Sequence, residues 1–142
     1  MTIVLLFTFL LAQVAPASLE QIRADANPEH RAKVAIDFAV GSEHAAEADY
    51  TKGDMAAVTA DLKTMAAAVE LAKEALERTG KTASRNPGPF KSAELKTQDI
   101  LVRLGDLEKR MDSEERSVLE GPRTRVQEIH DAWFEGIMSK KK

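Results

Sequence analysis

Between Asn27 and Met138 apolar residues recur every three or four positions, and no stretch alternates apolar and polar residues over a strand's length. This spacing predicts helices that each bury one face. In the helix predicted over residues 55–79, the apolar positions are spaced alternately three and four residues apart and form a regular seam. They are Met55, Val58, Leu62, Met65, Val69, Ala72 and Leu76. The next two helices have seams formed by Ala93, Thr97, Ile100, Leu104, Leu107 and Met111, and by Leu119, Val126, Ile129, Trp133 and Ile137. The chain is therefore predicted to be all-α.

Capping residues divide this pattern into four helices. Asn27 before a proline suits a helix start, and Gly53 and Gly80 suit the left-handed positions that close helices. Asp112 with Glu115 three places on predicts a capping box. The predicted helices span residues 28–51, 55–79, 90–111 and 114–138.

The predicted helices form one domain over residues 28–138, with an N-terminal extension at 18–27, a linker at 80–89 and a basic tail at 139–142. Two helical hairpins joined by one longer link indicate either a four-helix antiparallel bundle or a short, repeat-like stack of two hairpins. Gly121-Pro122 is expected to kink the last helix or to split it, because proline lacks an amide donor.

The first seventeen residues have the pattern of a secretory signal peptide. An apolar run over residues 2–14 ends in Ala15-Pro16-Ala17 before Ser18, a small-x-small cleavage pattern. The run is shorter than the roughly 20 residues that a membrane span needs, so no stable span is expected after cleavage. We therefore expect export to the periplasm or the medium, with an uncleaved N-terminal anchor as the alternative.

Composition narrows the function classes. The chain has no cysteine, which excludes disulfides, thiolate metal sites and a catalytic cysteine. Its net charge of −3 gives no electrostatic case for nucleic-acid binding. No Gly-x-Ser-x-Gly elbow or glycine-rich nucleotide turn is present, so no catalytic residue is predicted and the protein is expected not to be an enzyme.

The three histidines, His30, His44 and His130, are interpreted as surface or helix-end residues. None belongs to a His-Glu-x-x-His pair, and a metal site needs three or four converging ligands. His44 and Glu47 lie one helical turn apart, a spacing at which two side chains can share an ion. No metal site and no cofactor is predicted.

The predicted turn between the first two helices resembles a tetratricopeptide repeat. A small residue and an aromatic end the first helix, a Gly-Asp pair turns the chain, and apolar positions follow at helical spacing. The residues concerned are Ala46, Tyr50, Gly53, Asp54, Val58, Leu62 and Met65. The resemblance covers residues 42–76, one helical hairpin, and implies binding of a peptide or protein rather than catalysis.

Two further features suggest contact surfaces. Arg78, Lys81, Arg85 and Lys91 are four cations in a stretch without acidic residues, where a loop beside a helix start can hold an anion. Phe134 follows Trp133, and adjacent helical side chains diverge by about 100 degrees, so Trp133 fits the seam and Phe134 lies at the rim unless a wide stripe buries both.

Together these features predict a non-enzymatic exported helical protein that acts as a protein-interaction or scaffold module. Its expected partner is another envelope protein or a second copy of itself. The alternative is a bundle that binds a small ligand or an anion through the basic loop, residues 78–91.

Overall fold

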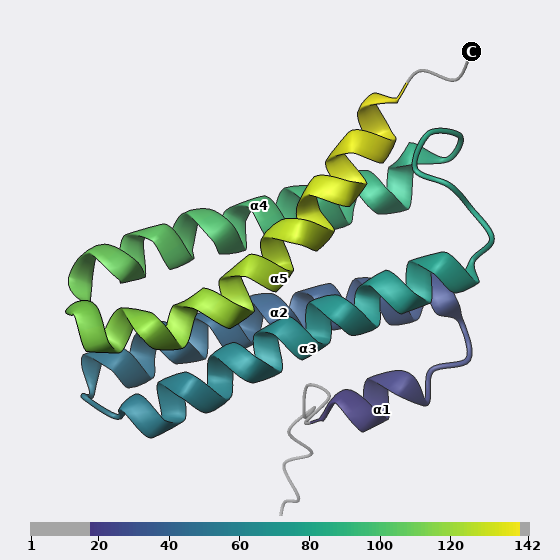
Figure 1. Cartoon of the computed structure of the whole chain (residues 1–142). Helices are drawn as coiled ribbons and strands as arrows, with labels where there is room; N and C mark the ends of the chain where they lie inside the picture. Colours follow the sequence, from purple (N-terminus) through teal and green to yellow (C-terminus); the bar gives the residue numbers. More distant parts are fainter. Residues whose placement is uncertain (1–17, 140–142) are drawn as a thin grey trace, which may run out of the picture.

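The computed structural model describes residues 18–139, and within that range the chain forms five helices and no strands (Figure 1). The helices are α1 (Leu19–Arg23), α2 (Pro28–Thr51), α3 (Met55–Arg78), α4 (Pro87–Arg110) and α5 (Ser113–Met138). The all-α prediction is confirmed. The predicted signal peptide, residues 1–17, and residues 140–142 of the basic tail lie outside the described residues.

The long helices form two antiparallel hairpins, α2–α3 and α4–α5, stacked in parallel. In the stack α2 lies against α4, and α3 lies against α5. Ion pairs join Asp37 of α2 to Lys96 of α4 and, further along both helices, Glu47 to Arg103, so α2 and α4 run in the same direction; another ion pair joins Glu70 of α3 to Arg125 of α5. An up-down four-helix bundle would instead place antiparallel helices side by side. The arrangement corresponds to the predicted stack of two hairpins.

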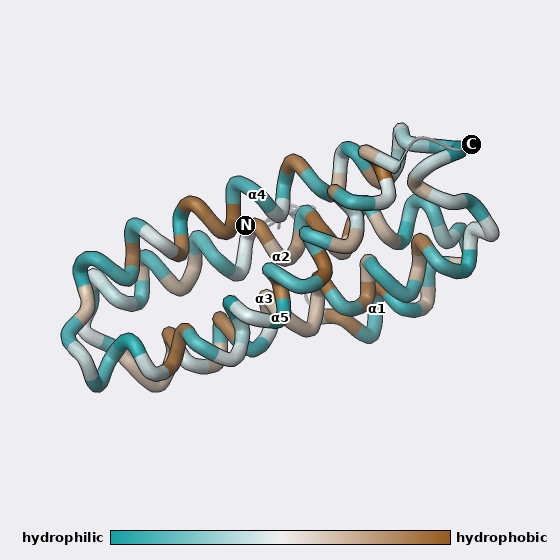
Figure 2. The backbone as a smooth tube through the Cα atoms, turned by 45° about the horizontal axis from the view of Figure 1, so that its top comes forward, coloured by the Kyte–Doolittle hydropathy of each residue, from teal (hydrophilic) through white to brown (hydrophobic). Residues whose placement is uncertain are grey.

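The predicted seams supply the core between the layers. Along each long helix the tube in Figure 2 alternates between hydrophilic and hydrophobic segments, as expected for helices with one buried face. Every seam residue of α3, α4 and α5 is buried except Met55 and Ile137, which are partly buried. The α2 side of the core is built largely from small residues, namely Ala32, Ala35, Ala39 and Ala46, together with Ile36.

The predicted helix signals are confirmed at most ends. Asn27 and Asp54 each accept a backbone hydrogen bond at a helix start, and Gly53 and Gly80 have φ angles of 77° and 70°. The capping box is formed in both directions, because the Asp112 amide donates to Glu115 Oε1 at 3.0 Å and the Glu115 amide donates to Asp112 Oδ1 at 2.8 Å.

Two sequence-based boundaries need correction, and the structure decides between the two alternatives at Pro122. The predicted extension at 18–27 contains α1, which Ser18 caps and which buries Ile22 against α2 and α3. Helix α4 begins at Pro87 rather than at residue 90, because the first turn of a helix tolerates prolines whose missing amide would have had no partner. Helix α5 runs unbroken through Pro122 and changes direction along its course in Figure 1, so it is bent rather than split.

The connection between the hairpins packs on the fold. Its Ala83 is buried, and a Cβ added to Gly136 of α5 would lie 2.9 Å from the Ala83 Cβ. At the opposite end of the stack, Tyr50 Oη donates to the Arg110 carbonyl at 2.7 Å and the Arg110 guanidinium lies 5.1 Å from the centre of the Tyr50 ring. Both ends of the stack are thus fixed by contacts between the hairpins.

No helix among residues 18–139 is long and apolar enough to cross a membrane.

Candidate functional site

The four cations of the predicted basic loop do not converge. Lys81 Nζ lies 2.8 Å from Glu29 Oε2 on α2 and is therefore paired. Arg78, at the end of α3, instead lines a hollow of about 530 Å³ together with Arg23, Arg31 and Glu74. Arg85 and Lys91 are exposed. The structure therefore divides these cations among different neighbours, which weakens the case for a single anion site in the loop.

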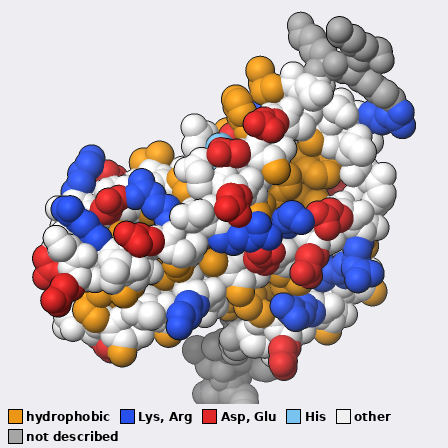
Figure 3. All heavy atoms as spheres, viewed as in Figure 1, with side chains coloured by type: hydrophobic (Ala, Val, Ile, Leu, Met, Phe, Trp, Pro, Cys, Tyr) orange, Lys and Arg blue, Asp and Glu red, His pale blue; other side chains and the backbone are white. Residues whose placement is uncertain are grey.

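The adjacent aromatics on α5 have different environments. Trp133 is buried at 6% exposure, whereas Phe134 is 48% exposed. Of the two alternatives that the sequence left open, the structure has Trp133 in the seam and Phe134 outside it, rather than both aromatics buried. Met138, one turn further on, is 64% exposed, and apolar side chains are visible on the surface near the C-terminal end of α5 in Figure 3.

The inner face of the Phe134 ring packs on His130, which is itself paired with Glu94. The Phe134 ring stacks on the His130 ring with centroids 6.3 Å apart and an interplanar angle of 14°. His130 Nε2 lies 3.0 Å from Glu94 Oε1 of α4, and both side chains are nearly buried. The interpretation of His130 as a surface residue is wrong, because α4 covers its ring. His30 and His44 are exposed, as predicted.

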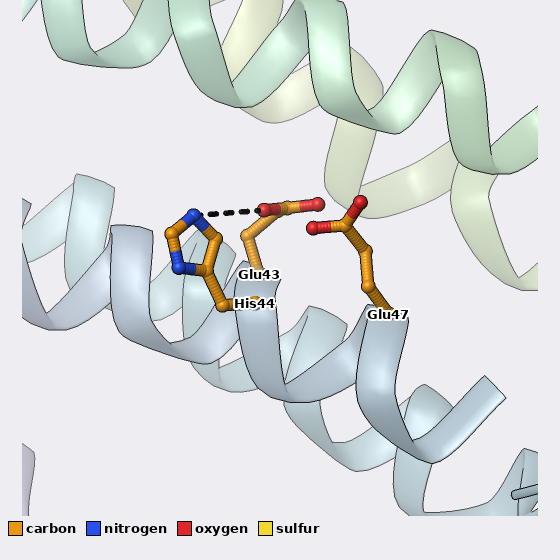
Figure 4. Close-up of side chains that lie close together, drawn as sticks. All are labelled: Glu43, His44 and Glu47. Atoms are coloured by element: carbon orange, nitrogen blue, oxygen red, sulfur yellow. Dashed lines mark ion pairs between the residues drawn. The ribbon is translucent and has the colours of Figure 1, made fainter. Parts of the chain in front are cut away.

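A second buried glutamate lies on α2 and faces α4. Glu43 is completely buried, and neither of its carboxylate oxygens has a hydrogen-bond partner. The His44 Nε2 atom lies 3.8 Å from Glu43 Oε2, beyond hydrogen-bond distance. Figure 4 shows the imidazole and the Glu47 carboxylate on either side of the Glu43 carboxylate, with α4 above them. One ligand atom from each of Glu43, His44 and Glu47 lies within 4.8 Å of the other two.

The electrostatics of this cluster follow from burial and from like charges. Burial, together with the neighbouring Glu47 carboxylate, raises the pKa of Glu43 to about 8. Among the described residues, the cation that lowers the pKa of Glu43 is Arg103, whose Nη1 lies 3.1 Å from Glu47 Oε2 and whose Nε lies 3.3 Å from Asp99 Oδ2. The Arg103 guanidinium thus pairs with the carboxylates of Glu47 and Asp99 and leaves Glu43 without a cation in direct contact.

The sequence contained a signal for this cluster that periodicity alone did not use. Glu43 stands in the buried seam of α2, between Ala39 and Ala46, at a position where a small or apolar residue is expected. The pair of His44 and Glu47 was noted from its spacing, but Glu43 was not. Glu94 likewise occupies a buried position next to Ala93 on α4. A charged residue within an apolar seam is the feature that identifies both sites.

The sequence matches no family model and no curated protein, and the structure matches no solved structure.

Proposed function

We propose that the protein is a non-enzymatic exported helical module that binds another protein of the cell envelope, or a second copy of itself, through the α5 surface centred on Phe134. The observation that carries this proposal is the half-exposed Phe134 ring, stacked on His130. Aromatic side chains at such positions contribute disproportionately to protein interfaces.

The support beneath Phe134 matters because binding loses affinity to side-chain ordering. His130 holds one face of the ring, and Glu94 of the neighbouring helix holds His130 at 3.0 Å. The aromatic side chain is therefore ordered before a partner arrives. Met138 extends the apolar surface along α5.

The layered arrangement of the hairpins gives a second line of support. In repeat proteins, helical hairpins stack so that each repeat packs mainly on its neighbours and presents an extended binding surface. The tetratricopeptide-like segment, residues 42–76, spans the α2–α3 turn, and its Tyr50 reaches across to Arg110 of the second hairpin. A repeat-like use of this stack agrees with partner binding rather than catalysis.

The proposal of export is based on the signal-peptide pattern of residues 1–17, and cleavage at the predicted site would produce a chain with a known first residue. A cut after Ala17 leaves Ser18 as the first residue, and the Ser18 side chain still accepts the Gln21 amide that caps α1 at 3.3 Å. The mature chain therefore keeps α1 and the burial of Ile22 intact.

The test is crosslinked capture of the tagged protein from its own cell envelope, read by mass spectrometry, together with sedimentation to detect self-association. Phe134→Ala is expected to lower recovery of the partner by about tenfold or more. Val102→Ala is the matched control, because Val102 is 59% exposed on α4 and lies outside this surface. Equal recovery with both variants contradicts the proposed surface, and a recovered chain that begins upstream of Ser18 contradicts cleavage after Ala17.

A further inference from the structure

The α2–α4 interface contains an arrangement that the proposed interaction surface does not use. Glu43, His44 and Glu47 bring two carboxylates and one imidazole together, and Glu43 is completely buried with both oxygens unpartnered. A buried carboxylate without a donor is costly unless a positive group compensates for it. The side chains that pack around it supply no direct hydrogen bond.

We propose that Glu43, His44 and Glu47 form a binding site for one divalent transition-metal ion of the zinc class. The chemistry of the ligands selects this class. Zinc and its neighbours bind imidazole nitrogen together with carboxylate oxygen, whereas calcium and magnesium prefer sites made of oxygen alone. Three protein ligands with one position left for water are typical of an open zinc site.

The geometry is close to what such an ion requires. Metal–ligand bonds of about 2.0–2.2 Å place neighbouring ligand atoms roughly 3.3 Å apart in a tetrahedral site. The three ligand atoms already lie within 4.8 Å of one another. The His44 side chain is 49% exposed and the Glu47 side chain is 27% exposed, so both have more room to adjust toward an ion than the completely buried Glu43.

The local charge also fits a divalent cation. With Glu43 ionised, as metal binding requires, Glu43, Glu47 and Asp99 contribute three negative charges and Arg103 contributes one positive charge, which leaves −2 with neutral imidazole. At neutral pH the ion therefore displaces the proton that the buried Glu43 carboxyl holds in the metal-free protein. Arg103 contacts Glu47 through one oxygen, Oε2, and the other Glu47 oxygen is available to a metal ion. The exposed side of the cluster, at His44, gives the ion a path from solvent.

The experiment is calorimetric titration of the full chain, purified without a polyhistidine tag, with Zn²⁺, supported by the visible spectrum of the Co²⁺ complex. We expect one Zn²⁺ per chain, intense Co²⁺ bands of a four-coordinate site, and no displacement of Zn²⁺ by a tenfold excess of Ca²⁺. His44→Ala and Glu43→Gln should each weaken Zn²⁺ binding by about tenfold or more. His44→Ala changes only an exposed side chain, and Glu43→Gln preserves the shape of a buried one.

The matched control is His30→Ala, which removes another exposed histidine from the same helix and should leave binding unchanged. Three results overturn the proposal: no binding of Zn²⁺, binding that His44→Ala and Glu43→Gln leave intact, or binding that His30→Ala removes. Because Phe134 lies outside this cluster, Phe134→Ala should leave Zn²⁺ binding unchanged, so this site and the interaction surface can fail independently.

Discussion

Glu43 of α2 is buried where α2 packs on α4, and Glu94 of α4 is buried where α4 packs on α5, yet the two environments differ. Glu94 on α4 receives His130 from α5 at 3.0 Å, whereas Glu43 on α2 has no hydrogen-bond partner and its nearest cation, Arg103, is bonded to Glu47 instead. The comparison shows that a charge within a helical seam is stabilised only where the facing helix offers a complementary group. The α4–α5 hairpin offers one, and the α2–α4 contact does not.

The largest expected effect comes from breaking the paired site. His130→Ala leaves Glu94 buried without its partner and removes the ring beneath Phe134, so we expect a loss of about 2–4 kcal/mol in the free energy of unfolding. Urea unfolding at neutral pH measures it. His44→Ala is the matched control, since it removes an exposed histidine beside the unpaired Glu43, and should change stability by less than about 0.5 kcal/mol. Equal losses would remove the distinction between the two sites.

Replacing Glu43, the glutamate without a partner, should raise the free energy of unfolding rather than lower it. Glu43→Leu exchanges a buried carboxylate without a partner for an apolar side chain of similar size, and we expect it to stabilise the metal-free protein by about 1–3 kcal/mol. Glu94→Leu should destabilise instead, because it removes the group that pairs with His130 Nε2 in the interior and leaves only the contact of Nδ1 with Asp131. Urea unfolding of both variants with a chelator present provides the comparison, and destabilisation by Glu43→Leu would contradict it.

The pH dependence of the Glu43→Leu effect has a defined sign. The pKa of Glu43 in the folded protein is raised to about 8 from an ordinary value near 4.5, so between these values the folded state binds more protons than the unfolded state. Stability of the parent protein therefore falls as pH rises through this window, and the advantage of Glu43→Leu should grow from pH 4.5 to about 8.

A smaller effect of the same kind is expected at Asp61 on α3. Its Oδ2 atom is buried without a partner, and burial together with Asp49 raises its pKa to about 6, with Asp54 adding to the effect. The folded state therefore binds extra protons between about pH 3.8 and 6, and stability falls as pH rises across that range. Asp61→Asn should raise the urea midpoint above pH 6 and have less effect near pH 4. Asp106→Asn, at an exposed position of α4, should show no such pH dependence.

Much of the fold could be predicted from local signals. The seams of α3, α4 and α5, the glycines that close α2 and α3, and the Asp112 capping box depend on residues within one or two turns of each other. The segment at Leu19–Arg23 was missed because a five-residue helix has too few positions to show a period. Its helix is held by the burial of Ile22, which is a tertiary contact.

The candidate sites were predicted less completely. The angular offset of Phe134 from Trp133 follows from helix geometry alone, but whether the core covers both aromatics was decided only by the packing, which leaves Phe134 exposed. The closeness in sequence of the four cations between residues 78 and 91 suggests one basic surface, but the fold gives Arg78 and Lys81 different neighbours. His130 could not be placed without knowing that Glu94 of another helix lies opposite it.

The sequence by itself determined which residues form helices, where the long helices end and which face of each is apolar, because helical periodicity and capping act over a few residues. Only the tertiary structure decided that the two hairpins stack in parallel, with α2 on α4 and α3 on α5. The same packing paired Glu94 with His130 and left Glu43 unpaired between helices. Partners for buried charges come from segments distant in the chain, and their positions depend on the packing of whole helices.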